Sequence, residues 1–473
     1  MQGALRTAAI LGAAGLLAAA CAEGPRRFGG ARHVVMISLD TTRPDHFGFY
    51  GSQRVRTPRL DRLAEESVVL DDLLTVAPTT LASHASLMTG RHPHSHGVPR
   101  NGFVLDPANL TLAEILHSHG FRTVAFVASF ALARRFGLDQ GFDVYDQRFE
   151  QRSGEGGADQ DQRRAEAVTD AVLGFLDREG VPRNLFLFVH YFDPHAPYAP
   201  PPPFDRMYDP AGADQPVNLR AAAAMCRERP GLPSALARRA ANLYAGEISY
   251  LDAQVGRLID GLRSRGVLDD AYLVVTSDHG ENLCEHPGYF DHGLTVYQTS
   301  IRAVGLVRPP GGGGGTRTSR PLSTIDIMPA LLTWLGLPVP EAVEGEPFPL
   351  RAAEEAAPAR LRYAEASKPW EEVEGGLRWR NARKSRCVVQ GRYKLIVTPY
   401  LGTEELYDLD ADPSEQHNLL EEPTPAAREI AESLRARLAE WDASADPLPS
   451  RFEPGRREDT LRRLRGLGYL GGP

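Results

Sequence analysis

Hydrophobic residues fall into short unbroken runs along this chain, and the runs alternate with longer segments in which apolar residues recur every three or four positions. Unbroken runs rich in β-branched and aromatic residues are typical of strands that are buried on both faces. The pattern predicts strands at 33–39, 123–128, 185–190, 272–276 and 303–307. It predicts helices at 57–66, 111–119, 165–177 and 241–262. This alternation indicates an α/β fold with a mainly parallel sheet sandwiched by helices.

The pattern changes near residue 361, where shorter apolar runs replace the buried strands. Antiparallel strands are predicted at 387–389, 393–397 and 406–409, and a helix is predicted at 425–441. We therefore expect a main domain at 33–360 and a C-terminal part at 361–473 that consists of a smaller α+β subdomain and a tail.

Residues 1–21 have the form of a lipoprotein-type signal peptide. An arginine precedes an apolar stretch at 7–20 that is too short to span a bilayer and ends in small residues before Cys21. This ending resembles a bacterial lipobox, although Ala18 stands where leucine is usual. We expect export to the periplasm or cell envelope, a tether at 22–32, and membrane attachment only through a lipid on Cys21. Plain secretion with cleavage near Cys21 is the alternative.

Composition narrows the choice of partners. The chain has 473 residues and a net charge of −8, so it lacks the basic surface that nucleic-acid binding requires. No lysine precedes residue 368, and the lysines are Lys368, Lys384 and Lys394. The cysteines after the leader fit no metal motif, and the sequence does not decide which of them pair: Cys226, Cys284 and Cys387.

Acidic and imidazole side chains follow three of the predicted strands. The strand ends lead into Asp40, into His190 with Asp193, and into Asp278 with His279. Ligands of parallel sheets gather at the carboxyl ends of the strands. The sequence therefore predicts a metal site at this edge of the sheet.

Two carboxylates and one imidazole, from Asp40, Asp278 and His279, suit Zn, Mn, Mg or Ca rather than a thiophilic metal. Thr80, at the start of a predicted helix, is a candidate fourth ligand. Its hydroxyl can simply cap the helix, or a metal can activate it as a nucleophile.

Three further histidines are candidates for acting on substrate oxygens, because imidazole can donate a hydrogen bond, act as a general acid or bind metal. They are His84, His195 and His292. A second metal ion held by Asp193, His195 and His292 is the alternative to direct substrate contact, which we favour. Three other histidines are expected at the surface and receive no role: His92, His94 and His96.

Taken together and in this order, the motifs resemble those of the sulfatase family of the alkaline phosphatase superfamily. They lie at 38–45, 78–91, 191–195, 277–281 and 405–409, and the resemblance covers residues 33–420. It implies the fold of that superfamily and a divalent metal bound by Asp40, Thr80, Asp278 and His279. It also places His292 where arylsulfatases of the family carry a lysine that contacts the sulfate.

The nucleophile position departs from the formylglycine type of sulfatase. Those enzymes carry Cys or Ser there, followed by x-Pro-Ser-Arg, whereas Thr80 is followed by Ala82 and His84 at the Pro and Arg positions. A secondary alcohol cannot be oxidised to an aldehyde, so we expect no formylglycine. Threonine at this position resembles the phosphodiesterases, phosphatases and phospho-group transferases of the superfamily.

We therefore expect a metal-dependent hydrolase of a phosphate or sulfate ester, with Thr80 as a metal-bound nucleophile and phosphodiesters or phosphomonoesters favoured. The substrate is expected to be a small-molecule, glycan or lipid ester. The alternatives are an arylsulfatase-like sulfuric ester hydrolase, a phospho-group transferase, and a non-catalytic lipid-anchored binding protein. The transferases usually carry several transmembrane helices, which this sequence does not predict, so a hydrolase is favoured.

Overall fold

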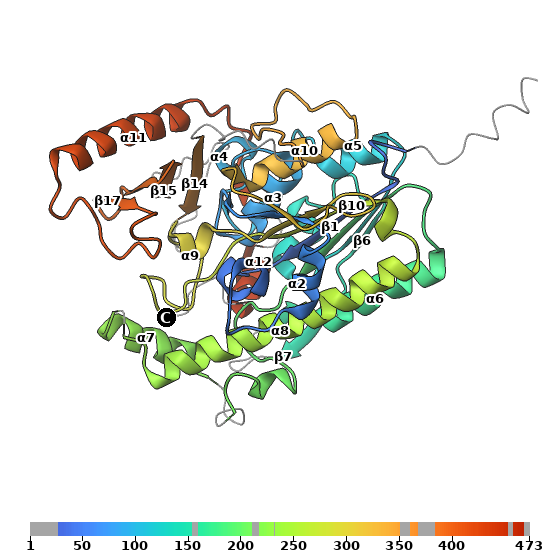
Figure 1. Cartoon of the computed structure of the whole chain (residues 1–473), viewed down its shortest axis with the longest axis horizontal. Helices are drawn as coiled ribbons and strands as arrows, with labels where there is room; N and C mark the ends of the chain where they lie inside the picture. The colour runs from blue at the N-terminus through green and yellow to red at the C-terminus, as the bar shows by residue number, and fades with distance from the viewer. Residues whose placement is uncertain are drawn as a thin grey trace, which may run out of the picture.

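The structure of the protein is a computed structural model, shown in Figure 1. It describes residues 27–153, 159–210, 217–230, 232–350, 360–367, 384–452 and 457–467. The predicted signal peptide with Cys21 lies outside the described residues, as does Lys368. At the other end of the predicted tether, Phe28 and Ala31 are buried against the main domain.

The main sheet has eight strands among the described residues, and the sheet is mainly parallel, as predicted. In spatial order they are β12 (Thr316–Thr318), β2 (Val68–Leu70), β11 (Gly305–Arg308), β10 (Ala271–Ser277), β1 (His33–Leu39), β9 (Leu185–Tyr191), β5 (Arg122–Phe126) and β6 (Val144–Asp146). Only β11 runs against its neighbours in this described sheet. The centre is occupied by β1, whose seven residues are all buried between β9 and β10.

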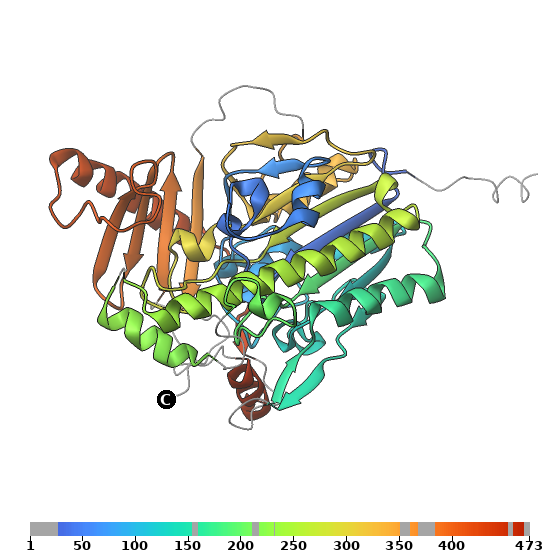
Figure 2. The same ribbon diagram turned by 60° about the horizontal axis from the view of Figure 1, so that its bottom comes forward.

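Helices cover both faces of this sheet (Figures 1 and 2). One layer contains α2 (Pro58–Ala64), α6 (Ala165–Glu179) and α8 (Ala235–Ser264), and the other contains α3 (Thr80–Thr89), α5 (Leu112–Ser118) and α10 (Ile327–Trp334). In α6, Val168, Val172 and Phe175 form the buried stripe expected of an amphipathic helix. α8 begins six residues before the predicted start at 241, because the Ser234 side chain accepts the Ala237 N–H and caps it there.

The C-terminal subdomain is an antiparallel sheet with a helix on one face. Its strands are β14 (Leu361–Ser367), β15 (Lys384–Gln390), β16 (Tyr393–Thr398) and β17 (Thr403–Asp408), and its helix is α11 (Pro425–Ala443). Alternate side chains separate two apolar layers. Val388, Leu395 and Leu406 pack against α11, whereas Cys387 and Ile396 face the main domain. The tail returns to the main domain, where β18 (Arg451–Phe452) pairs with β4 (Phe103–Val104) and α12 (Arg457–Gly466) follows.

The described cysteines comprise one bonded pair and one thiol. Cys226 in α7 (Leu219–Glu228) and Cys284 in the loop after β10 form a disulfide, whereas Cys387 is a buried thiol. Within the part of the chain that the structure describes, no helix combines the length and the apolar character needed to cross a bilayer.

A buried ion pair lies where the C-terminal subdomain contacts the main domain. Lys394 in β16 donates to Glu415 at 2.5 Å, and both side chains are fully buried. Glu415 also accepts the Gln298 N–H at 2.5 Å, at the start of α9 (Gln298–Ile301). Burial raises the pKa of Glu415 even though Lys394 opposes this shift. Glu415 therefore links the start of α9 in the main domain to β16 of the C-terminal sheet.

Replacing Lys394 with methionine is expected to lower the free energy of unfolding by about 3 kcal/mol, because it leaves the Glu415 carboxylate buried without its cation. Urea unfolding measures the change. The double variant Lys394→Met/Glu415→Gln is the control, and it should recover part of the loss. A single variant as stable as the wild type would show that the pair contributes nothing.

The expectation that His92, His94 and His96 lie at the surface is wrong. His92 and His96 are buried, and His94 is nearly so, in and before α4 (Pro93–His96). The reason is Trp441 of α11, whose ring lies 5.2 Å from His92 and 4.2 Å from His94, and Tyr363 stacks on the same tryptophan at 4.8 Å. His92 and His94 therefore belong to the contact between the main domain and the C-terminal subdomain, whereas His96 lies 2.9 Å from the Ser86 hydroxyl within the main domain.

This burial predicts a loss of stability in acid. Burial lowers the pKa of His92 to about 3, whereas the unfolded chain binds this proton near pH 6.5. The unfolded state then holds more protons below pH 6.5, so His92 should reduce the free energy of unfolding by roughly 2 to 3 kcal/mol between pH 7 and pH 4.5. Urea unfolding at both pH values should show a smaller drop for His92→Phe. The exposed His117→Phe is the control, and an equal drop in His92→Phe would contradict the prediction.

Candidate active site

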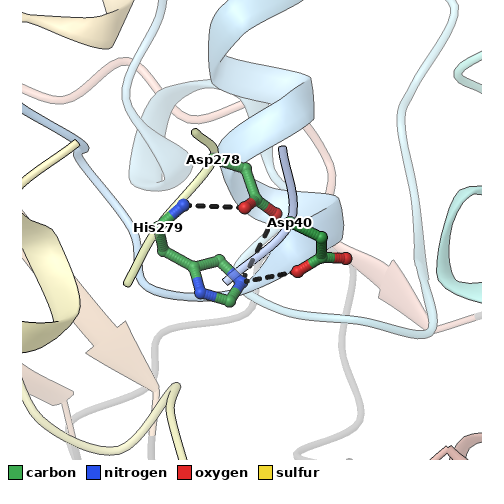
Figure 3. A group of neighbouring side chains, drawn as sticks. All are labelled: Asp40, Asp278 and His279. Carbon is green, nitrogen blue, oxygen red and sulfur yellow. Dashed lines mark hydrogen bonds and ion pairs between the residues drawn. The ribbon is translucent and has the colours of Figure 1, made fainter. Parts of the chain in front are cut away.

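Three candidate metal ligands meet at the carboxyl edge of the main sheet. Asp40 follows β1 directly, and Asp278 and His279 follow β10. Because Leu39 pairs with Ser277 in the two neighbouring strands, the residues that come next lie side by side. Figure 3 shows the two carboxylates and the imidazole pointing toward one another, and their ligand atoms lie within 4.8 Å of one another.

The His279 ring is oriented as a metal ligand. Its Nδ1 lies 2.9 Å from the Gly280 carbonyl oxygen, so Nδ1 carries the proton and Nε2 has a free lone pair. Nε2 faces Asp278 Oδ2 at 3.4 Å and Asp40 Oδ1 at 3.7 Å (Figure 3). Three electron-rich atoms therefore converge, an arrangement that a divalent cation stabilises.

The charges of this group also fit a metal. Asp40 and Asp278 are buried, and Asp40 Oδ1 and Asp278 Oδ2 accept no hydrogen bond from the described residues. Burial, together with Asp278 and Glu281, raises the pKa of Asp40 well above its usual range, and burial raises the pKa of Asp278 to about 7. Two buried carboxylates without a cation are costly, and oxygen and nitrogen donors of this kind suit Zn, Mn, Mg or Ca.

A second layer holds the two carboxylates in place. His190, at the end of β9, accepts the Ala128 N–H on Nδ1 and donates from Nε2 to Asp40 Oδ2 at 3.2 Å. This leaves Asp40 Oδ1 directed at His279. Thr41 has a φ of +52°, a strained value for a non-glycine residue, and this conformation turns its N–H toward Asp278 Oδ1 at 3.2 Å.

Thr80 lies at the same point. It is the first residue of α3 and is fully buried, and its Oγ1 is 3.5 Å from His279 Nε2. The N-terminus of a helix favours negative charge, which builds up on a hydroxyl as it loses its proton and attacks. The helix is anchored on both sides, because Ser83 donates to the Asp278 carbonyl at 2.8 Å and Asn101 accepts the Leu81 N–H at 2.7 Å.

His84 lies one turn further along α3 and is fully buried. Its Nδ1 donates to the Thr80 carbonyl at 2.6 Å, and its Nε2 accepts from the Ser38 hydroxyl at 2.8 Å. Burial lowers its pKa to about 4, so the ring is neutral near pH 7. Because both ring nitrogens of His84 are hydrogen-bonded within the protein, the geometry favours a role for His84 in positioning Thr80 over a role in contacting the substrate.

The rings of His195 and His292 lie next to each other, and His292 lies next to the candidate metal ligand His279. Their ring centres are 5.0 Å apart, and that of His292 is 4.4 Å from that of His279. His292 lies 3.2 Å from Glu281 Oε1, and the other oxygen of Glu281 accepts the Tyr198 hydroxyl at 3.2 Å. Burial opposes the charged form of His292, but Glu281 outweighs it and raises the pKa. Burial and the neighbouring His292 lower the pKa of His195 well below its usual range.

The structure thus brings Asp40, Thr80, Asp278 and His279 to one point and places the three other candidate histidines around it. Sequence reasoning named His190 only as a group at a strand end and gave no role to Glu281, although Glu281 stands in the motif at 277–281. The available signals were the place of His190 at the end of a buried strand and that of Glu281 in the loop after β10. Arg100, described below, carried no such signal.

Comparison with known proteins gives a family and a fold. The profile described as "Sulfatase" matches residues 32–337, and the profile described as "N-sulphoglucosamine sulphohydrolase, C-terminal" matches residues 284–444. An arylsulfatase of Clostridium perfringens (strain 13 / Type A) is 24% identical over 446 residues, which cover 82% of this chain and 90% of the relative. A multifunctional alkaline phosphatase superfamily protein of Trinickia caryophylli is 24% identical over 499 residues, with coverage of 87% and 96%.

A solved structure supports the same architecture. The phosphonate monoester hydrolase of Agrobacterium radiobacter superposes with a TM-score of 0.67 at 22% identity. The superposition covers 87% of this chain and 95% of that protein. At this level of identity the likeness establishes the fold, which is the predicted α/β sheet with a C-terminal antiparallel subdomain.

Proposed function

The chain belongs to the sulfatase family of ester hydrolases, and from this premise we propose that it hydrolyses a phosphate ester with the Thr80 hydroxyl as nucleophile and a divalent metal as cofactor. Phosphodiesters and phosphomonoesters are the favoured substrates, carried by a small molecule, a glycan or a lipid. The observation that carries the proposal is the side chain of residue 80. It is a secondary alcohol, which cannot become formylglycine, and it lies 3.5 Å from His279 beside two buried carboxylates.

Asp40, Asp278 and His279, with Thr80, would hold the metal. When bound, a divalent ion lowers the pKa of a nearby hydroxyl and neutralises charge on the transferred group. The residues themselves set the geometry. His190 orients Asp40 through the 3.2 Å hydrogen bond described above, and α3 presents Thr80 with its helix N-terminus toward the transferred group.

In the proposed reaction, Thr80 loses its hydroxyl proton to solvent, and its Oγ1 forms a bond to phosphorus as the bond to the leaving oxygen breaks. The leaving oxygen receives a proton, for which His292 is the favoured donor, because Glu281 holds its Nδ1 at 3.2 Å and its ring centre lies 4.4 Å from that of His279. Water then gives a proton back to His292 and attacks the phosphorus of the phosphorylated Thr80, and the bond from phosphorus to Thr80 Oγ1 breaks. The Thr80 oxygen takes up a proton from solvent, and the product is phosphate from a phosphomonoester or a phosphomonoester from a phosphodiester. His195 is assigned to contact with the substrate oxygens beside His292.

Mass spectrometry of protein trapped with substrate tests this proposal. Rapid acid quenching during turnover of an aryl phosphodiester, followed by proteolysis, should give a phosphoryl adduct that keeps the second ester group, on the peptide that contains Thr80. The same experiment with an aryl sulfate is the control. An adduct or turnover with the sulfate alone would favour the sulfuric ester hydrolase instead, and retained metal with no turnover of either ester would favour a binding protein.

We also propose that the protein is exported and anchored by a lipid on Cys21. The Cys226–Cys284 disulfide supports an oxidising compartment, where such bonds persist. Metabolic labelling with palmitate and fractionation test the anchor. Cys21→Ala should abolish the label and release the protein from the membrane fraction, and an unlabelled wild type would contradict the anchor but leave export open.

A further inference from the structure

Arg100 lies beside the candidate active site without a role in the arrangement described so far. It is 2% exposed and lines a small cavity of about 20 Å³ together with Thr79, His292, Gly293 and Ser367. Thr79 precedes the proposed nucleophile, and the His292 ring is 4.4 Å from that of His279. The cavity therefore adjoins the space where the transferred group would lie.

The backbone on both sides of Arg100 is fixed. Before it, the Pro99 carbonyl accepts the Ser367 hydroxyl at 3.1 Å, which ties this loop to β14. After it, Asn101 Oδ1 accepts the N–H of Leu81 at 2.7 Å, the residue that follows Thr80. The guanidinium itself lies 5.8 Å from the centre of the Phe103 ring. A side chain held in this way loses little entropy when it binds a ligand.

The cavity has a carboxylate as well as a cation. Asp291 also lines it, but its Oδ1 accepts the His292 N–H at 2.8 Å. No residue before 368 is a lysine, so the segments at 79, 100 and 291–294 that line the cavity contribute no lysine side chain. Lys384 and Lys394 are bound to glutamates of the C-terminal subdomain at 2.7 and 2.5 Å. Arg100 is therefore the fixed cation among the described residues that line this cavity.

From this placement we propose that Arg100 forms an anion subsite that binds a non-bridging oxygen of the transferred phosphate or sulfate group. This inference rests on the proposed function. Guanidinium groups bind such oxygens with short, charge-assisted hydrogen bonds. The volume of the cavity suffices for about one water molecule, so it can accommodate one oxygen atom of the group. Negative charge on that oxygen changes during attack, and a fixed cation beside it stabilises the transition state.

Binding of inorganic phosphate, which needs no turnover, separates this inference from the proposed function. In the Thr80→Ala background loaded with metal, Arg100→Met is expected to weaken phosphate binding by about 30-fold in calorimetry, and Arg100→Lys by about 5-fold. With Thr80 present, Arg100→Met should lower kcat/KM for an aryl phosphodiester by about 100-fold. Metal content, measured by inductively coupled plasma mass spectrometry, should not change.

The matched control is Arg362→Met, which removes another buried arginine that pairs with Asp72 at 2.6 Å. It should leave phosphate affinity unchanged. Phosphate affinity within twofold in the Arg100→Met protein would overturn the inference. A loss of kcat/KM that occurs only with substrates whose leaving group carries its own acidic group would also overturn the inference. Arg100 would then bind the leaving group and not the transferred group. If Arg100→Met fails to fold, the Arg100→Lys protein carries the test.

Discussion

Replacing Thr80 with alanine is expected to lower kcat for a phosphate ester by ~10⁴-fold or more, a loss of the size seen when an enzyme loses its nucleophile. The change removes the hydroxyl that lies 3.5 Å from His279 Nε2 and leaves Asp40, Asp278 and His279 intact. Metal should therefore still bind, and the folded structure should persist. Single-turnover kinetics with an aryl phosphodiester measure the chemical step, and elemental analysis measures the metal.

The matched control is Thr80→Ser, which keeps a hydroxyl at the N-terminus of α3. We expect kcat within about tenfold of the wild type, because the nucleophile remains and only a methyl group is lost. Thr80→Ala protein that turns over the ester at the wild-type rate would show that another group, or water, attacks the phosphorus. If kcat falls equally in Thr80→Ser and Thr80→Ala, the methyl group and not the hydroxyl of Thr80 is what the reaction needs, which contradicts the proposed chemistry.

The central strands could be predicted because they are buried on both faces and therefore read as unbroken apolar runs. The run at 33–39 is the observed β1, and the run at 185–190 lacks only Tyr191 of β9. By contrast, β2 has three residues, and β12 is short, polar and largely exposed, so neither gives a periodic signal. Short strands at the edge of the sheet, such as β12, and next to it, such as β2, depend on their neighbours more than on their own composition.

The meeting of the candidate metal ligands could also be predicted, because residues that follow adjacent parallel strands must meet at one edge. The side chains that surround these candidate ligands could not be predicted in this way. His190 reaches Asp40 across 150 positions of sequence, and Arg100 shares its cavity with Thr79, His292 and Ser367. The burial of His92 is a similar case, because Trp441, far along the chain, covers it. Such contacts come from the packing of distant segments, which a local pattern does not contain.

Removing the metal is expected to destabilise the wild-type protein, and Asp278→Asn is expected to abolish that dependence. Without a cation, Asp40 and Asp278 face each other in a buried site where ionised carboxylates repel. Excess metal at ~1,000 times its dissociation constant adds about 4 kcal/mol to the free energy of unfolding, so chelation should lower the melting temperature by several degrees. In Asp278→Asn, weakened metal binding should shrink this shift and lower activity at least ~10³-fold.

The stabilities of the wild type and Asp278→Asn after chelation of the metal give a sharper test of ligation. Asp278→Asn removes one of two like charges but keeps a side-chain oxygen for the N–H groups of Thr41 and His279, which donate to Asp278 Oδ1 at 3.2 and 2.8 Å. The chelated variant should therefore be more stable than the chelated wild type, whereas the order reverses when metal is added. Glu285→Gln is the control, because Glu285 pairs with Arg43 at 2.7 Å outside the ligand group, and its metal response should match the wild type. A full metal-dependent shift in Asp278→Asn would contradict its role as a ligand. Reversal of the order by metal separates ligation from ordinary damage, since a merely disruptive substitution lowers stability under both conditions.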